Sequence, residues 1–361
     1  LDLIRFTAAL VVVLSHAAGF TSLKIPIISG LGTEAVVVFF VLSGYVIAYV
    51  SNNKENNYIP FFKARAIRIY SVLVPAILIT LFLDHIGLKY NPSYYFLHSN
   101  FHNDYSIFTF IKLLFFFGEG FNQHLVFGSN EPIWSIGFEC IYYILFGTLL
   151  FCRKKAFLIL IFFIFIFISL PKVIVYFPLW LMGVFIYKMS NVYFKYSHFL
   201  FVLTFPLFYL TIKLPLAHIP MYKPFIWDWS QFSSILYFYL FSLVVSINIF
   251  TARAFFEFTG FEKILTSCER YIRYLSGKTF TLYLTHLPVM MLICSLYYPK
   301  SIISSLFVVV ITILITFFFS SLFENKKVFY LLLVVIFLLK FQVYINHKSC
   351  SFSSLEYEVI F

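Results

Sequence analysis

Two ionisable side chains interrupt the apolar segment LDLIRFTAALVVVLSHAAGF at the start of the chain. Arg5 and His16 are eleven residues apart, which in an α-helix is three turns plus about 20°, so both side chains lie on one face. A rise of about 1.5 Å per residue separates them by roughly 16 Å along the helix axis. If Arg5 marks one edge of a membrane, His16 lies past the middle of the hydrocarbon core. An ionisable group is costly at that depth, and a histidine there is a candidate general base.

A second group of cations has the chemistry to bind phosphate. Arg65 and Arg68, within FFKARAIRIY, are three residues apart and therefore share one face of a helix, with Lys63 close by. Guanidinium groups bind phosphate bidentately, a geometry that lysine does not offer. The structural alternative is a charge cluster that contacts lipid headgroups and fixes the topology of the chain.

Two further polar positions lie inside apolar segments. Glu139 belongs to EPIWSIGFECIYY, where an unpaired carboxylate is expensive, so that it must pair with an arginine or a histidine. Trp134 lies within about 140° of Glu139 around the helix, with Ser135 beside it. His286, in SGKTFTLYLTHLPVMM, closely precedes Pro288. It either bonds a carbonyl group that the proline leaves free or contacts a substrate.

The composition indicates which elements must position these residues. Of the 361 residues 61% are hydrophobic and 11% are charged, against about 25% charged residues in soluble proteins. The net charge of +11 is spread over the gaps between apolar segments, which is the pattern of a membrane protein and excludes a nucleic-acid-binding patch. Five scattered cysteines without a CxxC motif predict neither a disulfide framework nor a metal site.

We therefore predict an all-α fold, a polytopic integral membrane bundle with about 10–11 transmembrane helices. The apolar segments fall at 1–20, 31–50, 71–88, 132–151, 156–171, 173–189, 198–214, 232–250, 279–297, 302–322 and 328–345. The shorter piece IFTFIKLLFFF, within 89–131, has too few residues to cross. With the N-terminus in the cytoplasm, alternation places 17 of the 26 basic residues, and every arginine, on the inner side.

Taken together, the motifs resemble those of the acyltransferase type 3 family of integral membrane proteins. The resemblance rests on LDLIRFTAALVVVLSH with its R-x10-H spacing, FFVLSGYVI, FFKARAIRIY, PIWSIGFECIYY and LSGKTFTLYLTHLPV, in the order of the family. It covers residues 1–324, the expected membrane acyltransferase domain. Residues 325–361 continue beyond the usual end of the family, and we expect one additional transmembrane helix there.

The resemblance implies an enzyme that O-acylates bacterial surface glycans such as O-antigen, capsule or exopolysaccharide. It further implies a location in the bacterial inner membrane, among its lipids, and a cytoplasmic acyl-CoA donor, usually acetyl-CoA, without a permanently bound cofactor. The acceptor is a lipid-linked or exported glycan. The residues that match functional motifs of the family are Arg5, His16, Arg65, Arg68, Trp134, Ser135 and Glu139.

We assign roles to these residues on chemical grounds. His16 is the expected base, while Arg5 and Glu139 orient the reacting groups. The phosphates of CoA would bind to Arg65, Arg68 and Lys63. The expected contacts with the substrate come from Trp134, Ser135 and His286. Whether His16 becomes acylated or acts only as a base stays open at this point.

Two other classes of membrane protein share this composition. A flippase or transporter of lipid-linked oligosaccharides also lines its path with buried charges, but no inverted repeat is visible in the sequence. An inner-membrane glycan polymerase carries its arginines in a large outer loop, whereas here every arginine is expected on the inner side.

Overall fold

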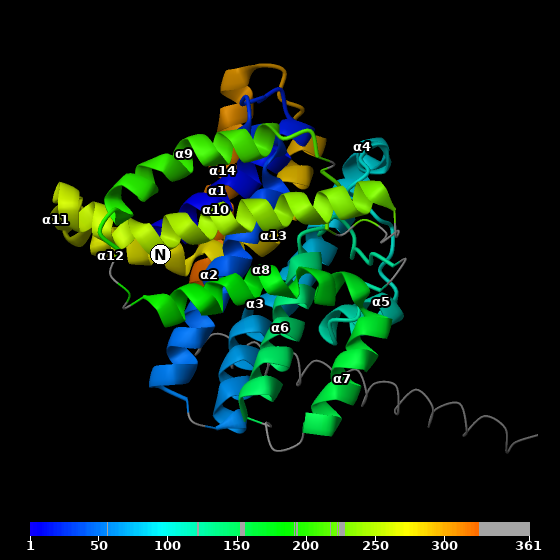
Figure 1. The fold of residues 1–361 in the computed structure, drawn as a ribbon. Helices are drawn as coiled ribbons and strands as arrows, with labels where there is room; N and C mark the ends of the chain where they lie inside the picture. The colour runs from blue at the N-terminus through cyan, green and yellow to red at the C-terminus, as the bar shows by residue number, and fades with distance from the viewer. Residues whose placement is uncertain are drawn as a thin grey trace, which may run out of the picture.

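The computed structural model describes residues 1–324 except 56, 121–122, 152–155, 191, 193, 217, 222 and 224–227. Every named element within this part of the chain is helical (Figure 1). The helices are α1 (Asp2–Phe20), η1 (Ile28–Gly30), α2 (Gly32–Asn53), α3 (Tyr58–Tyr90), α4 (Pro92–Leu97), α5 (Ile107–Leu114), α6 (Ile133–Phe151), α7 (Ala156–Ser169), α8 (Pro171–Met189), α9 (Ser197–Lys213), α10 (Trp229–Thr259), α11 (Phe261–Ser267), α12 (Glu269–Gly277), α13 (Thr279–Leu296) and α14 (Ile302–Phe323).

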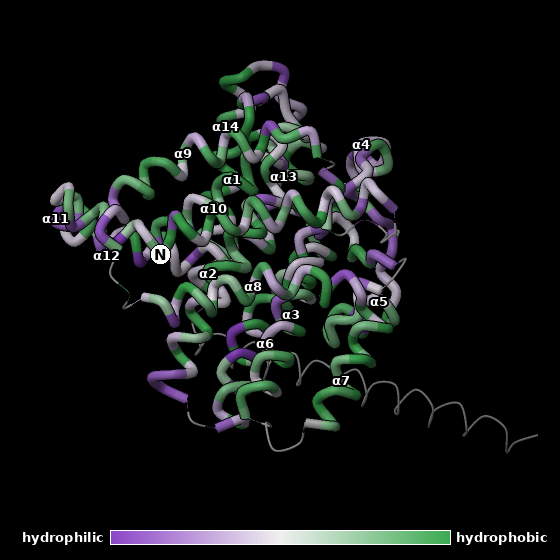
Figure 2. Tube along the Cα trace, in the orientation of Figure 1, coloured by the Kyte–Doolittle hydropathy of each residue, from purple (hydrophilic) through white to green (hydrophobic). Residues whose placement is uncertain are grey.

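Eight of these helices are long and apolar enough to cross a membrane, namely α1, α2, α3, α6, α8, α10, α13 and α14. The apolar helices α7 and α9 are shorter. Together they coincide with ten of the expected apolar segments, and the eleventh, 328–345, lies outside the described residues. Large apolar side chains such as Phe157, Ile168 and Phe307 are exposed on the surface, as they are in a protein surrounded by lipid. Figure 2 shows that hydrophobic residues predominate along α7. The prediction of a polytopic helical bundle is confirmed.

Two helices extend past the ends of the expected spans. α3 begins at Tyr58 and so includes the basic segment around Arg65, while α10 runs on to Thr259. Charged residues end an apolar segment but do not end a helix, since lysine and arginine are good helix formers. The terminus of α10 is instead set by Gly260, whose φ of 71° lies in the left-handed region.

Close packing of α2 on α8 fixes the centre of the bundle. A Cβ atom at Gly44 would lie 2.0 Å from the carbonyl oxygen of Trp180, and one at Gly183 would lie 1.9 Å from that of Val41. Only glycine allows the two backbones to approach this closely.

Polar contacts gather several helix ends at one end of the bundle. Arg5 of α1 donates to Ser276 of α12 over 3.4 Å, and the label for the chain start lies beside α12 in Figure 1. At the start of α13, Thr281 donates to Glu324, which follows α14, over 2.6 Å. The starts of α1 and α13 thus lie on the same side as the end of α14, as alternating spans require.

Candidate active site

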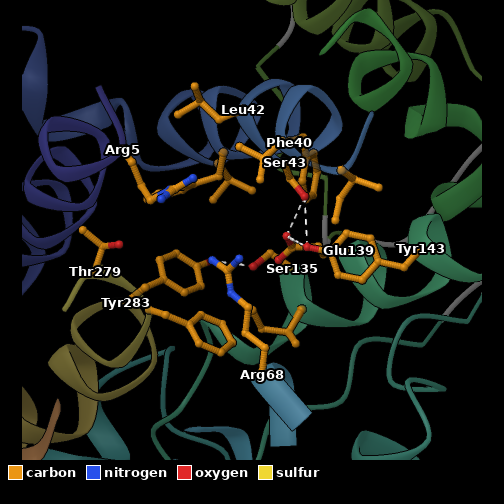
Figure 3. Close-up of a pocket in the computed structure, with 16 residues that line it drawn as sticks. Arg5, Phe40, Leu42, Ser43, Arg68, Ser135, Glu139, Tyr143, Thr279 and Tyr283 are labelled. Carbon is orange, nitrogen blue, oxygen red and sulfur yellow. Dashed lines mark hydrogen bonds between the residues drawn. The ribbon is translucent and has the colours of Figure 1, made fainter. Parts of the chain in front are cut away.

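A small cavity of about 70 Å³ lies among α1, α2, α3, α6 and α13 and opens at the surface (Figure 3). Apolar residues of α2, including Phe39, Phe40 and Val46, form much of its wall. Its polar lining residues come from all five helices: Arg5, Ser43, Arg68, Ser135, Glu139, Tyr143, Thr279 and Tyr283. Four residues expected from the sequence, Arg5, Arg68, Ser135 and Glu139, are therefore brought together here.

Two guanidinium groups, on α1 and α3, point into this cavity (Figure 3). Arg5 is anchored by Nη1, which donates to Asp2 over 3.2 Å and to Ser276 over 3.4 Å. Arg68 lies toward solvent, and its charge is close enough to interact electrostatically with that of Arg5. Like charges that face one cavity repel each other, so an anion bound between them would lower the electrostatic energy.

The carboxylate of Glu139 is held in place on the α6 side of the cavity. Its Oε1 accepts hydrogen bonds from Ser43 Oγ, over 2.6 Å, and from the hydroxyl of Tyr143. Ser43 in turn accepts a bond of 3.1 Å from the indole nitrogen of Trp180, the residue against which α2 packs. The fixed carboxylate and the two guanidinium groups leave the cavity with an excess of positive charge.

A pair of histidines lies deeper in the bundle, where α1 meets α13. The ring centroids of His16 and His286 are 5.2 Å apart. His286 is fully buried, and its Nδ1 donates to the carbonyl oxygens of Leu282, at 3.1 Å, and Tyr283, at 2.8 Å. Because Nδ1 carries the proton, Nε2 carries the lone pair. Nε2 of His286 has no hydrogen-bond partner among the described residues.

Tyr283 forms the wall between the arginine cavity and the histidine pair. Its hydroxyl lines the cavity and is 2.7 Å from Ser135 Oγ, and its ring centroid is 6.3 Å from that of His286. Tyr283 is not among the residues expected from the sequence. The signal for it was present, because Tyr283 precedes His286 by three residues and so lies on the same face of the helix.

A second carboxylate that the sequence analysis passed over lies near the histidines. Glu131, at the start of the quoted segment EPIW, interacts electrostatically with His16 and accepts a hydrogen bond from Asn100. The neighbouring Asn130 donates to Thr80, over 2.8 Å, and to the carbonyl oxygen of Leu284, over 2.9 Å. These bonds tie the turn before α6 to α3 and α13.

The same turn is fixed from α3 by a buried carboxylate. Asp84 accepts bonds from the backbone nitrogen of Ser129, over 2.8 Å, from its hydroxyl, over 2.6 Å, and from Tyr105, over 3.0 Å. Gly128 has a φ of 59°, and a Cβ atom there would lie 2.1 Å from Asp84. Nothing in the sequence around Asp84 indicates these contacts, because its partners Tyr105 and Ser129 lie 21 and 45 residues away.

Five of the expected residues do not line the cavity: His16 and His286, which form the pair described above, and Arg65, Lys63 and Trp134. Arg65 is buried, ion-paired with Glu55, and its guanidinium carbon lies 3.9 Å from the centroid of the Phe61 ring. Lys63 is exposed on the surface of α3. Trp134 is buried against Phe138, with ring centroids 5.3 Å apart. Of the two arginines expected to bind phosphate, Arg68 lines the cavity together with Arg5, and Arg65 does not.

Comparison with known proteins agrees with the expected family. The sequence model of a family described as "Acyltransferase domain" matches residues 1–324. An O-acetyl transferase of Shigella phage Sf6 is 30% identical over 178 residues, which are 48% of this chain and 51% of the phage protein. The chain thus spans about half the length of that curated relative. No solved structure shows a significant match.

Proposed function

Because the chain belongs to the acyltransferase family whose model covers residues 1–324, we propose that it is a membrane O-acetyltransferase. It transfers an acetyl group from acetyl-CoA to a hydroxyl of a bacterial surface polysaccharide such as O-antigen, capsule or exopolysaccharide. The observation that carries the proposal is the cavity with two arginines, separated by Tyr283 from a histidine pair in which His286 is fully buried and His16 is partly buried. The name of the phage relative supports acetyl as the group transferred.

The donor enters the arginine cavity from the side on which Arg68 is exposed. CoA carries several phosphate charges, and a guanidinium group binds phosphate more specifically than an ammonium group does. Arg68 at the mouth and Arg5 deeper inside would bind the anionic part of the donor. On this account both residues lie on the cytoplasmic side of the bacterial inner membrane, which agrees with the charge pattern of the sequence.

Transfer takes place where the cavity meets the histidine pair. His16 accepts the proton of the acceptor hydroxyl, whose oxygen bonds to the thioester carbonyl carbon. The Tyr283 and Ser135 hydroxyl groups share one hydrogen bond, and the proton that this bond does not use can turn to the resulting oxyanion. When the carbon–sulfur bond breaks, the CoA thiolate takes the proton from His16, which returns the histidine to its neutral form.

His286 serves as a positioning residue in this scheme. Its Nδ1 proton is committed to two backbone carbonyl groups, so its Nε2 keeps a lone pair that has no partner among the described residues. A ring nitrogen of His16 that donates to this lone pair leaves the other nitrogen unprotonated, as a base must be. Glu131 adds a negative charge that stabilises the imidazolium form during transfer.

The test is acetyl transfer by the purified protein in nanodiscs. We expect acetyl-labelled acetyl-CoA to lose its label to a lipid-linked glycan extracted from the host, with release of free CoA. Acid-quenched protein that carries label on His16 would identify a two-step route through an acyl-enzyme. Movement or polymerisation of the glycan without consumption of acetyl-CoA would overturn the proposal.

A further inference from the structure

A second, larger cavity lies on the other side of α1 from the histidine pair. It is a groove with about 1670 Å³ of empty space, bounded by α1 and α2 on one side and by α9 and α10 on the other. Apolar side chains dominate its lining, among them Ile4, Val11, Val38, Phe205 and Phe241. Arg5, Arg68 and His16 do not line it, so it is separate from the candidate active site.

The groove continues into a polar crevice at one end. The crevice has about 1900 Å³ of empty space, lies among α2, α6, α8 and α10, and shares Tyr45, Ile249 and Arg253 with the groove. Among the described residues that line the crevice, the charged side chains are Lys188 and Arg253. Arg253 pairs with Glu257 over 2.7 Å and is otherwise open to solvent.

The groove exists because a helical hairpin is packed on one side only. α9 and α10 run side by side (Figure 1), with Phe208 near Phe241 and Phe201 near Phe255. The hairpin packs against α8 and α2 through α10, and its face toward α1 lines the open groove. Within a bilayer such an apolar opening is filled by hydrocarbon.

The length and charge of the groove and the crevice together indicate which ligand would fit them. From Arg253 to Phe241, α10 rises twelve residues, or about 18 Å, close to the thickness of one leaflet of a hydrocarbon core about 30 Å thick. The cations lie at the end where the headgroup of a lipid would be. We propose that the groove and crevice bind a phospholipid with an anionic headgroup, its phosphate at Arg253 and Lys188 and an acyl chain along α10. This site is independent of the proposed acetyl transfer.

Glu34 marks the far end of the groove. It is buried and accepts a hydrogen bond of 2.9 Å from Tyr237, while its other carboxylate oxygen has no partner among the described residues. A polar group at this position interrupts the apolar lining. The acyl chain would therefore end before Glu34, at the level of Phe241 and Val38.

The experiment measures lipid binding to the full chain by native mass spectrometry. The protein, released from detergent, is offered phosphatidylglycerol or phosphatidylcholine at equal concentration. We expect preferential retention of phosphatidylglycerol, and roughly tenfold weaker retention by the double variant Arg253→Ala, Lys188→Ala, because each basic residue near a membrane surface contributes to the attraction of anionic lipid. Val38→Trp, which fills the groove and keeps the charges, should also reduce retention.

A matched control variant removes two basic residues that lie outside the groove and the crevice. Arg273 forms an exposed pair with Glu269 of the same i,i+4 type as that of Arg253 with Glu257, and Lys263 is exposed on α11. The variant Arg273→Ala, Lys263→Ala should retain phosphatidylglycerol like the parent chain. Equal retention of both lipids, or equal loss in both double variants, would overturn the proposal. Retention of a polyisoprenoid lipid in place of phospholipid would overturn the choice of occupant.

Discussion

Arg65 and Arg68 illustrate how strongly the role of one residue type depends on its surroundings. Both belong to α3, three residues apart, yet Arg65 is buried beside Glu55 and Arg68 lines the mouth of the arginine cavity. Arg65 compensates a partly buried carboxylate, and Arg68 has its charge available to a ligand. Substitution of each should therefore change a different property of the protein.

We predict that Arg68→Ala raises the KM for acetyl-CoA by about tenfold or more, because a charge-assisted hydrogen bond contributes roughly 1.5–3 kcal/mol. Arg68→Lys should recover part of the loss, with a steeper dependence on salt. Arg65→Ala should leave this KM unchanged and lower the thermal stability of the protein, because it leaves the partly buried Glu55 carboxylate without its partner. A KM that rises equally in both variants would contradict the assignment.

His286 allows a second prediction at the residue scale. His286→Gln should lower kcat by about 100-fold, within the range for loss of correctly oriented proton transfer. The KM for acetyl-CoA should stay within about twofold, because His286 does not line the donor cavity. A variant that changes only thermal stability, with kcat retained, would assign His286 to packing alone.

The sequence predicts residues whose partners lie on the same helix better than those whose partners lie on another. The common face of Arg5 and His16 follows from helical geometry alone, and Ser135 and Glu139 come from one motif. By contrast, the orientation of Arg65 depends on Glu55, which precedes α3, and the position of Glu131 depends on a turn fixed by Asp84. Neither contact produces a periodicity that a single sequence could reveal.

At the scale of elements, the packing of α2 on α8 positions Ser43 and Glu139. We predict that Gly44→Ala lowers thermal stability and acetyl transfer together, because the added Cβ would lie 2.0 Å from the carbonyl oxygen of Trp180. Overpacking of this kind costs about 1–3 kcal/mol or more. Gly19→Ala is the control, since a Cβ there meets nothing within 4 Å. Equal melting temperatures for the two variants would show that α2 and α8 separate freely.

The existence of the helices was easier to predict than their ends. Ten apolar segments coincide with helices. A segment of about twenty apolar residues forms a helix in a membrane whichever other helices it packs against. The early start of α3 at Tyr58 and the late end of α10 at Thr259 depend on helix propensity outside the apolar segment. α5, with eight residues, is too short to cross, as expected for 107–117.

At the scale of the whole molecule, the orientation in the membrane can be read from a native cysteine. Cys268, between α11 and α12, is exposed, whereas Cys140 and Cys294 are buried. We predict that a membrane-impermeant maleimide labels Cys268 in inverted inner-membrane vesicles and not in intact spheroplasts. Cys152 and Cys350, outside the described residues, are replaced by serine beforehand. Labelling in spheroplasts would reverse the orientation and move the donor cavity to the opposite side.

Composition predicts that the molecule is a multi-pass membrane bundle, but it does not predict the cavities. Hydropathy and the distribution of basic residues predict a multi-pass bundle because they report how each segment meets lipid or water. A cavity depends on how helices far apart in sequence fit together. The arginine cavity draws on five helices and the lipid groove mainly on four, so both became visible only in the structure.

The most direct measurement is O-acetylation of the surface glycan in cells that express the parent chain, His16→Gln or His85→Gln at equal membrane abundance. His85 is an exposed histidine of α3 and serves as the control. Mass spectrometry should find acetylated glycan with the parent chain and His85→Gln, and a loss of about 100-fold or more with His16→Gln, because the base is removed. Full acetylation with His16→Gln would contradict the account and leave His16 as a packing residue.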